Sequence, residues 1–403
     1  MSSADNSPYP VHARASVGKT PIRALVGSYN DFGQRIFASL AKAPGNVVYS
    51  PYSAGVAFAM AMSGARGATQ EEFLEVMRLQ RQPSDIEAAN GFLAAALARR
   101  SAAQEAQAPV EPAIANLMAL ASPDGRLLVA PEYRDLLRKR YGAEVFENAA
   151  PATIDAWVAA RTRGQIRDVA TWDARSPPDF VLLNAIHFNG FWEQPFDAAA
   201  TTPSPFVTAA GRRIDVPTMR DTTARCYLEG DGFKAVWSPY RPDALGMLIV
   251  LPNHGVAPDA LVGRLAAQGL PLLAEQLLNT GLTQVELQLP RFSTRFEASL
   301  KAPAQTAGLR LPFEREGANF GGVTGRSEED LIYVDDVWQR ASVEVTEKRT
   351  RASAVTGPRG AALYSRARPL PPIPFHVDRP FLFYILHRHS GAILFQGRID
   401  DPR

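Results

Sequence analysis

Apolar residues recur at helical spacing in the first part of the chain. Leu25, Tyr29 and Phe32 lie three or four positions apart, which places their side chains on one face of an α-helix. The pattern predicts amphipathic helices within residues 21–79. Residues 80–107 are rich in alanine, arginine, glutamine and glutamate. These residues favour helix but offer few core anchors, so we expect a surface helix there.

From Phe180 onward the chain contains short apolar runs. They are rich in the β-branched and aromatic residues typical of strands, and they read FVLLNAIHF, LGMLIVLP, QVELQLPRF, SVEVT and FLFYILHR. Several are apolar at every position, which suits strands buried on both faces. Because helices come first, strands follow and no repeat or linker separates them, we expect one α+β domain over residues 22–403, after a disordered leader of residues 1–21.

Residues 347–374 fit neither a helix nor a buried strand. They contain five prolines, two glycines, and six basic residues against one acidic residue. Strand-like sequences flank the segment, so it is tethered at both ends. A loop of about 25 residues inside a compact domain is uncommon and is usually functional or disordered.

Charge and composition exclude several classes of function. Lys and Arg total 43 and Asp and Glu total 41, a net charge of +2, which is too small for bulk attraction to nucleic acid or an anionic membrane. The single cysteine, Cys226, allows no internal disulfide framework and no CxxC motif. His387 and His389 alternate on a predicted strand, with no third ligand in sight. No nucleophile elbow or phosphate-binding glycine loop occurs, so we expect no enzyme, no cofactor and no metal site.

The first twenty residues contain no basic stretch followed by an apolar core, so we expect no secretory signal in them. No apolar run reaches the roughly 18 residues that a membrane span requires. The compartment stays open at this point, cytoplasmic or, if a signal has been removed, extracellular.

Several motifs, in a fixed order along the chain, resemble those of the serpins, a family of serine protease inhibitors. They are NVVYSPYS from Asn46 with the apolar helix after it, LNAIHFNGFW ending at Trp192, MLIVLP, LQLPRF, and the C-terminal FHVDRPFLFYILHRHSGAILFQGRIDDP. No single motif would suffice, but their joint order over residues 22–402 is specific. The resemblance implies a serpin fold of three β-sheets and about nine helices, with an exposed reactive-centre loop at residues 347–374, in a monomer.

The resemblance also implies a mechanism and a partner. In this family a serine protease acylates itself on the reactive-centre loop. The cut loop then inserts as an extra strand in the main sheet, and this conformational change traps the protease. The implied function is therefore that of a suicide-substrate inhibitor, and the implied partner is a serine protease.

Counting along the loop predicts the bond that the protease cuts. In the family the cut usually follows the seventeenth residue from the hinge glutamate, here Glu347, which indicates the bond between Leu363 and Tyr364. Leucine suits chymotrypsin-like or subtilisin-like proteases. Two neighbouring bonds stay open as alternatives: Tyr364 to Ser365, with similar targets, and Arg366 to Ala367, which would suit a trypsin-like protease.

Side-chain alternation predicts which loop residues can enter the sheet. Successive strand residues point to opposite faces, and one face of this segment carries Arg351 and Arg359, whose burial without partners would cost several kcal/mol each. The opposite face is small and uncharged, so we expect it to be the buried one; its hinge residues are Thr350, Ala352, Ala354 and Thr356.

Two loop residues depart from the family pattern. Arg349 stands where the hinge usually has glycine, which can adopt backbone conformations that arginine cannot. Pro358 lacks the N–H that a central strand donates. These departures keep an alternative open, in which the protein is a non-inhibitory serpin-fold binding protein that proteases simply cleave.

Five further positions fall in functional clusters of the family. Ser50, Ser53 and Asn184 match the shutter, a polar cluster beneath the main sheet, in which Gln339 replaces the usual histidine. A local interpretation is that Ser50, followed by proline, caps a helix. Trp192 matches the breach, where the loop first enters, although a tryptophan flanked by phenylalanines is more often a core residue.

A basic cluster formed by Arg134, Arg138, Lys139 and Arg140 falls on a helix-like segment. Some serpins bind polyanions through such clusters, so weak polyanion binding is one expectation. The other is an ordinary solvated helix face.

Overall fold

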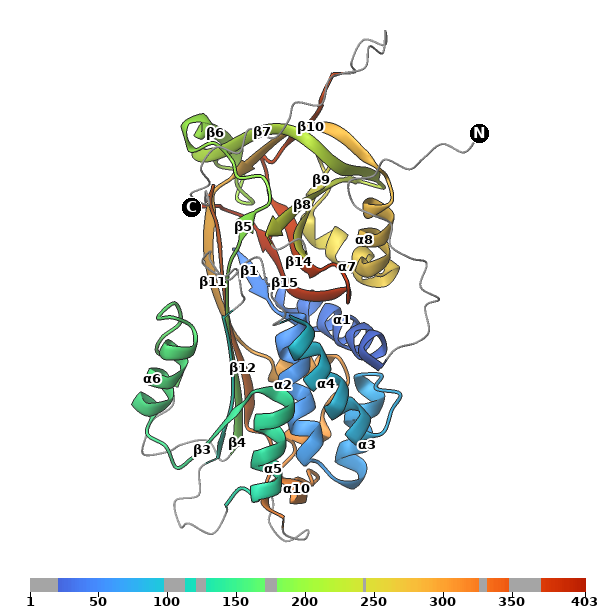
Figure 1. Cartoon of the computed structure of the whole chain (residues 1–403), viewed down its shortest axis with the longest axis vertical. Helices are drawn as coiled ribbons and strands as arrows, with labels where there is room; N and C mark the ends of the chain where they lie inside the picture. Colours follow the sequence, from blue (N-terminus) through green and yellow to red (C-terminus); the bar gives the residue numbers. More distant parts are fainter. Residues whose placement is uncertain are drawn as a thin grey trace.

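The structure is a computed structural model that describes residues 21–97, 113–120, 128–170, 180–241, 244–325, 332–347 and 371–403. Over these ranges the chain forms ten α-helices and fifteen strands. Figure 1 shows an elongated molecule, with a long sheet seen edge-on and most helices on one side of it. The α+β class agrees with the prediction. None of the helices described is long and apolar enough to cross a membrane.

The N-terminal helices are α1 (Pro21–Leu40), α2 (Pro51–Gly64), α3 (Gly67–Val76) and α4 (Pro83–Leu97). The predicted stripe of α1 is buried, with Leu25, Tyr29 and Phe32 in the core. All fourteen residues of α2 are buried, because this helix runs between the sheet and the other helices (Figure 1). The surface helix expected over residues 80–107 is α4, as far as the described residues reach.

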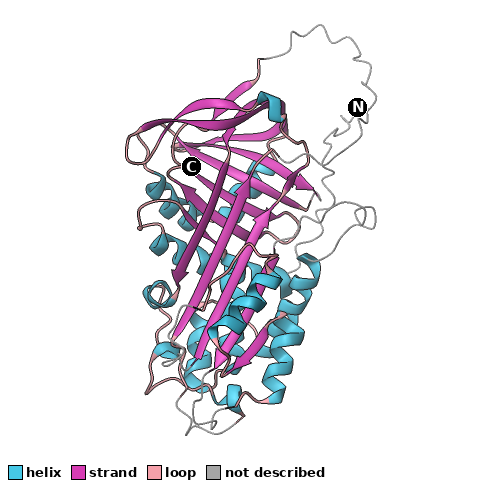
Figure 2. Cartoon of the chain, turned by 90° about the vertical axis from the view of Figure 1, so that its left-hand side faces the viewer, coloured by secondary structure: helices cyan, strands magenta, loops and turns pink. Residues whose placement is uncertain are grey.

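The main sheet has five strands in the order β11-β12-β4-β2-β3, and its long strands face the viewer in Figure 2. At its centre β12 and β4 run parallel, paired from Asp336 with Val181 to Glu344 with Asn189. We call this ladder the β12–β4 seam. The strands are β2 (Ala113–Leu120), β3 (Glu144–Glu147), β4 (Phe180–Asn189), β11 (Phe292–Ser299) and β12 (Asp336–Val345).

Each face of this sheet is covered by different helices. On the outer face, Leu183 and Ala185 of β4 pack with Ile154 and Val158 of α6 (Pro151–Arg161) in a small core of their own. The alternate residues of β2 and β4 point into the large core shared with the N-terminal helices. This alternation means that a polar side chain at an inward position lies beneath the sheet, next to α2.

The remaining strands form one hydrogen-bonded network of ten. The 18-residue strand β7 joins two parts of it, because residues 218–226 pair with β10 and residues 227–230 pair with β8. Of the three expected sheets, two are thus continuous through β7. The strands are β1 (Val47–Tyr49), β5 (Phe191–Trp192), β6 (Thr202–Val207), β7 (Arg213–Gly230), β8 (Phe233–Arg241), β9 (Leu245–Pro252), β10 (Leu282–Pro290), β13 (Ile373–His376), β14 (Phe381–His387) and β15 (Ala392–Ile399).

Shorter helices complete the molecule. Figure 1 shows α7 and α8 packed beside the strands β8, β9 and β14, on the side where α1 also lies. The helices are α5 (Pro131–Leu136), which continues as the π-helix η2 (Leu137–Tyr141), α7 (Pro258–Gln268), α8 (Leu270–Leu278), α9 (Lys301–Thr306) and α10 (Gly321–Thr324). Two 3₁₀ turns are η3 (Ala198–Ala200) and η4 (Leu311–Phe313).

The strand predictions from apolar runs are confirmed, but the expected order of elements is wrong. FVLLNAIHF lies in β4, LGMLIVLP is β9, and FLFYILH is β14, and both β9 and β14 are buried at every position. However, β1, β2 and β3 lie among the N-terminal helices. β1 has three residues, too few to show a period, and β2 is held by partners far away in sequence.

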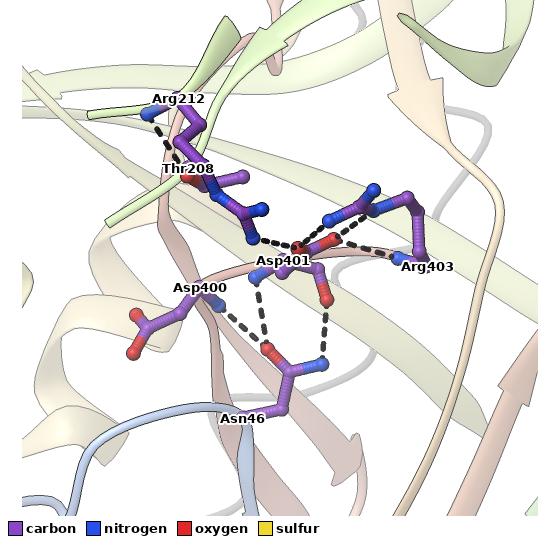
Figure 3. A network of polar contacts seen from close by, with 6 residues as sticks. All are labelled: Asn46, Thr208, Arg212, Asp400, Asp401 and Arg403. Carbon is purple, nitrogen blue, oxygen red and sulfur yellow. Dashed lines mark hydrogen bonds and ion pairs between the residues drawn. The ribbon is translucent and has the colours of Figure 1, made fainter. Parts of the chain in front are cut away.

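A polar network fixes the C-terminal tail to the start of β1 (Figure 3). The Asn46 carboxamide oxygen accepts from the N–H groups of Asp400 and Asp401, at 2.8 and 3.0 Å, and its amide donates to the Asp401 carbonyl at 2.6 Å. Arg403 holds the Asp401 carboxylate, and Arg212 lies 3.9 Å from it. The first residue of NVVYSPYS is therefore a structural anchor for the end of the chain.

Candidate functional site

Three buried amides lie side by side across the main sheet. Asn116 of β2 and Gln339 of β12 both stand opposite Asn184 of β4. The Asn184 amide donates to the Asn116 carboxamide oxygen at 2.6 Å, and the Gln339 amide donates to the Asn184 oxygen at 3.3 Å. We call these three residues the polar ladder. It crosses the β12–β4 seam, so the two strands cannot separate without breaking it.

The polar ladder is also tied to the start of α2. The Gln339 side-chain oxygen accepts from the Ser50 N–H at 2.7 Å, and its amide donates to the Ser50 carbonyl at 3.1 Å. Ser50 caps α2, since its hydroxyl accepts from the Ser53 N–H at 3.1 Å and Pro51 follows it. The predicted cap is confirmed, and Ser50, Ser53, Asn184 and Gln339 lie in one buried cluster.

Gln339 uses both ends of its amide in this cluster, as acceptor toward one group and as donor toward two. An amide cannot take up a proton near neutral pH, unlike the histidine expected from the family pattern. None of the five side chains of this cluster, Ser50, Ser53, Asn116, Asn184 and Gln339, titrates in that range. Opening of the seam should therefore not depend on their protonation.

Trp192 contacts the segment that follows β12. Its ring is 2 % exposed and stacks on Tyr240 at a centroid distance of 4.3 Å, with Phe196 at its edge. Its indole N–H donates to the Thr346 carbonyl at 2.9 Å. Trp192 is thus a core residue, and it also holds the backbone at the point where the described part of this segment ends.

Glu347 follows Thr346 and is a buried carboxylate, 6 % exposed, that is held by two side chains. Its carboxylate accepts hydrogen bonds from Arg291 and from the Thr201 hydroxyl. Burial alone would raise the pKa of Glu347, but the hydrogen bonds from Arg291 and Thr201 outweigh burial and hold the pKa below its usual value. We call these contacts the Glu347 anchor.

Residues 348–370, most of the predicted loop, lie outside the described residues. This applies to the hinge residues Arg349, Thr350, Ala352, Ala354 and Thr356, and to the bond residues Leu363, Tyr364, Ser365, Arg366 and Ala367. The described chain resumes at residue 371 and soon enters β13, which pairs with β10 in parallel. The segment is therefore held at both ends, as predicted, but its second tether is β13 rather than the FLFYIL strand. Because β13 begins at Ile373, the predicted loop extends two residues too far.

Sequence reasoning missed three residues of this site. Asn116 is the single strongly polar residue in the strand AIANLMAL, and that isolation was the available signal. Arg291 lies within the LQLPRF motif, between β10 and β11, but the motif alone did not indicate its partner. Thr201 carries no sequence signal, because a threonine before a strand is common.

The basic cluster is largely neutralised by neighbouring carboxylates. Arg134 pairs with Glu147 at 2.5 Å, while Arg138 and Lys139 share Asp135 at 2.7 and 2.9 Å. These residues lie on α5 and η2. For these three cations the structure agrees with the interpretation of the cluster as an ordinary solvated helix face.

His387 is buried at the end of β14, where its Nδ1 lies 2.8 Å from the Ser390 hydroxyl. Burial, together with the nearby His389, lowers the pKa of His387 to about 4. Among the described residues no group of three or more potential ligands could hold a metal ion. His387 is thus a neutral side chain of the fold at physiological pH.

Acid should destabilise the protein through His387. The unfolded state binds the proton near pH 6.5, and the folded state only near pH 4. Between these values the unfolded state holds more protons, so the free energy of unfolding falls as pH falls, by up to about 3 kcal/mol. We expect His387→Gln to reduce the drop in thermal midpoint between pH 7 and pH 4.5, whereas His254→Gln at an exposed position should not. An equal drop in all three proteins would contradict the assignment.

The match to a family model identifies the chain. The model described as "Serpin (serine protease inhibitor)" matches residues 27–402. This range includes every residue of the polar ladder and of the Glu347 anchor. The chain belongs to the serpin family. The resemblance noted from the sequence motifs is thereby confirmed.

Relatives and solved structures agree with this assignment. An uncharacterized serpin-like protein of Thermococcus kodakarensis is 32 % identical, over 94 % of this chain and 86 % of the relative. Plasminogen activator inhibitor 1 of Sus scrofa is 30 % identical, over 92 % of this chain and 91 % of that protein. The crystal structure of native protease nexin-1 with heparin has a TM-score of 0.79 at 24 % identity and covers 95 % of this chain and all of that one. The serpin fold is therefore shown, in a family whose members include protease inhibitors.

Proposed function

We propose that this serpin is a suicide-substrate inhibitor of serine proteases, with chymotrypsin-like or subtilisin-like proteases as its targets. The observation that carries the proposal is the closed β12–β4 seam, bridged by nine residue pairs, with the Glu347 anchor just beyond the end of β12. A chain leaving β12 at Glu347 is next to the gap that would open if the seam parted. The point at which the loop begins is thus next to its proposed receiving site.

In the proposed mechanism the protease serine hydroxyl attacks the carbonyl of Leu363. The bond to Tyr364 breaks, the amine of Tyr364 leaves with the C-terminal fragment, and Leu363 stays esterified to the protease. The freed loop then inserts between β12 and β4, starting at Thr350. About ten new backbone hydrogen bonds, each contributing about 0.5 to 1.5 kcal/mol, would supply on the order of 10 kcal/mol to displace the protease.

For this insertion the polar ladder has to open and close again around a new strand. Gln339 and Asn184 would exchange their mutual hydrogen bond for contacts with the incoming backbone. Trp192, which holds the Thr346 carbonyl, lies where the first inserted residues would pass. We therefore assign Ser50, Ser53, Asn184 and Gln339 to a shutter and Trp192 to a breach, as the family pattern implies.

We expect chymotrypsin or subtilisin to form a complex with the protein that survives denaturing gel electrophoresis. Mass spectrometry of the released C-terminal peptide should find Tyr364 as its first residue, because Leu363 has the family spacing and an apolar side chain for a deep pocket. A peptide beginning at Ser365 would move the bond by one residue with similar targets. A peptide beginning at Ala367, with trypsin as the partner, would replace the proposed target class.

Cleavage without a stable complex would support the alternative of a non-inhibitory serpin-fold binding protein. Arg349 and Pro358 favour that alternative, because both should hinder insertion. The thermal midpoint after cleavage separates the two cases. An inhibitor should gain a large amount of thermal stability when its cut loop inserts, and a plain substrate should gain little.

We also propose that polyanions bind only weakly to the basic cluster of α5 and η2. Protease nexin-1, a structural neighbour, was crystallised with heparin. In the present chain three cations of the cluster are paired with carboxylates, and the charge of Arg140 acts on Glu87. Such binding should vanish at moderate salt. Retention on a heparin column well above physiological salt would contradict it.

A further inference from the structure

A cavity of about 450 Å³ lies between the N-terminal half of α1 and the segment that joins α3 to α4. None of its lining residues belongs to the polar ladder or to the Glu347 anchor. Its volume falls in the range of small-molecule sites, which is about 300 to 1,000 Å³. The cavity is therefore a candidate site with no part in the proposed inhibition.

The base of this cavity is apolar. It is formed by Leu25 of α1, Leu79 of the joining segment, and Ile86 and Ala89 of α4, and all four side chains belong to the core. Gly27 also lines the cavity, and a Cβ atom added there would meet no atom within 4 Å. The absent side chain at Gly27 leaves space above the apolar base, so a hydrocarbon body could lie against it.

The rim of the cavity carries an excess of positive charge. Arg23, Arg78 and Arg81 line it, against one carboxylate, Asp31, which is 3.1 Å from Arg78. Arg23 and Arg81 are exposed and have no ion pair or hydrogen bond among the described residues. Two guanidinium groups are thus available to an incoming acid group, beside an apolar base.

The backbone at the rim is fixed by the C-terminal end of α3. Arg78 has φ +56, in the left-handed region that few non-glycine residues occupy. The Ser28 hydroxyl fixes it by donating to the Arg78 carbonyl at 2.9 Å. This conformation closes the end of α3, because the N–H groups of Arg78 and Leu79 donate to the carbonyls of Glu75 and Leu74 at 3.0 and 2.8 Å.

We propose that this cavity binds an amphipathic carboxylate, with the carboxylate at Arg23 and Arg81 and its hydrocarbon chain against the apolar base. A long-chain fatty acid is the simplest member of this class. A polyanion fits less well, because the cavity offers two free cations beside apolar side chains rather than a continuous basic track. The leader of the chain fits less well too, since residues 1–20 contain Arg14 and Lys19 against a single acidic residue.

The test measures binding of laurate to the full chain, below the micelle concentration, by titration calorimetry. We expect one saturable site. Dodecanol, which lacks the charge, and acetate, which lacks the chain, should each bind at least about tenfold more weakly. Equal binding of laurate and dodecanol, or no saturable binding of laurate, would overturn the proposal. The proposal would also be overturned if heparin displaced fatty acids of different chain lengths equally well.

Two glycine substitutions make a matched pair. Gly27→Leu should fill the cavity and weaken laurate binding at least about tenfold. Gly263→Leu on α7, where an added Cβ also meets no atom within 4 Å, should leave binding unchanged. Both changes replace an exposed helical glycine, so both should keep or raise the thermal midpoint. Laurate affinity that is unaffected by Gly27→Leu would place its site elsewhere and overturn the assignment.

The double variant Arg23→Gln and Arg81→Gln examines the head group. It should weaken laurate binding about tenfold and leave dodecanol binding as it was. Equal loss for both ligands would mean that the arginines only support the local fold, which would contradict the proposed role of their charge. Protease inhibition should be normal in all of these variants, so this result and the test of the proposed function can fail independently.

Discussion

Replacing Thr350 by arginine should turn the protein from an inhibitor into a substrate. In the proposed mechanism Thr350 is the first residue to enter the sheet, three positions after the Glu347 anchor. Its side chain would face the buried side of the inserted strand, where an unpaired charge costs several kcal/mol. The bond between Leu363 and Tyr364 is far along the loop, so proteases should still cut it. On a denaturing gel the variant should give cleaved protein and no complex.

The matched control for Thr350→Arg is Ser353→Arg. Ser353 lies on the opposite alternation of the same segment, together with Arg351, so an arginine there would stay in solvent. This control should keep the complex and consume nearly the same number of inhibitor molecules per protease. If Thr350→Arg still traps the protease, or if both variants lose the complex, the assignment of the buried face is wrong.

Replacing Gln339 by leucine should destabilise the closed sheet. The Ser50 N–H would lose its acceptor and Asn184 would lose a donor, both in a buried cluster. Each unsatisfied buried group costs about 1 to 3 kcal/mol, so for these two groups we expect a loss of about 2 to 6 kcal/mol. For a chain of this size that corresponds to a fall in thermal midpoint of about 2 to 7 °C.

The same change should also make the β12–β4 seam easier to part. We expect Gln339→Leu to lose inhibitory capacity faster than the parent protein during storage at 37 °C, because the loop can insert without being cut. Gln284→Leu on β10 is the control, since Gln284 is an exposed strand residue. Unchanged midpoints in both variants would show that the polar ladder contributes little to the closed state.

The sequence predicted this site unevenly, and the reason is physical. Ser50, Asn184 and Gln339 could be assigned because each sits in a recognisable motif or strand. Asn116 could not, since its role depends on β2 lying beside β4, a pairing of residues 68 positions apart. The Glu347 anchor likewise joins residues from three distant segments, and a local pattern cannot reveal such a meeting.

The fold was predictable where burial left a mark on composition. The strands β9 and β14 are buried at every position and almost entirely apolar, and they were predicted from that pattern. The strand β7 was not, because it is largely polar and is buried at only some of its positions. Its length, which makes two sheets continuous, is fixed by its neighbours β6, β8 and β10 rather than by its own residues.

The direction of the strands at the centre of the main sheet has a thermodynamic consequence. β12 and β4 run parallel, so a segment that turns back after β12 would run against both of them. Its insertion would exchange one parallel ladder for two antiparallel ladders, and antiparallel pairing is slightly more stable per residue. The closed sheet therefore pairs β12 and β4 in the less stable of the two orientations. A returning strand between them would replace this parallel pairing with antiparallel pairing along their whole shared length.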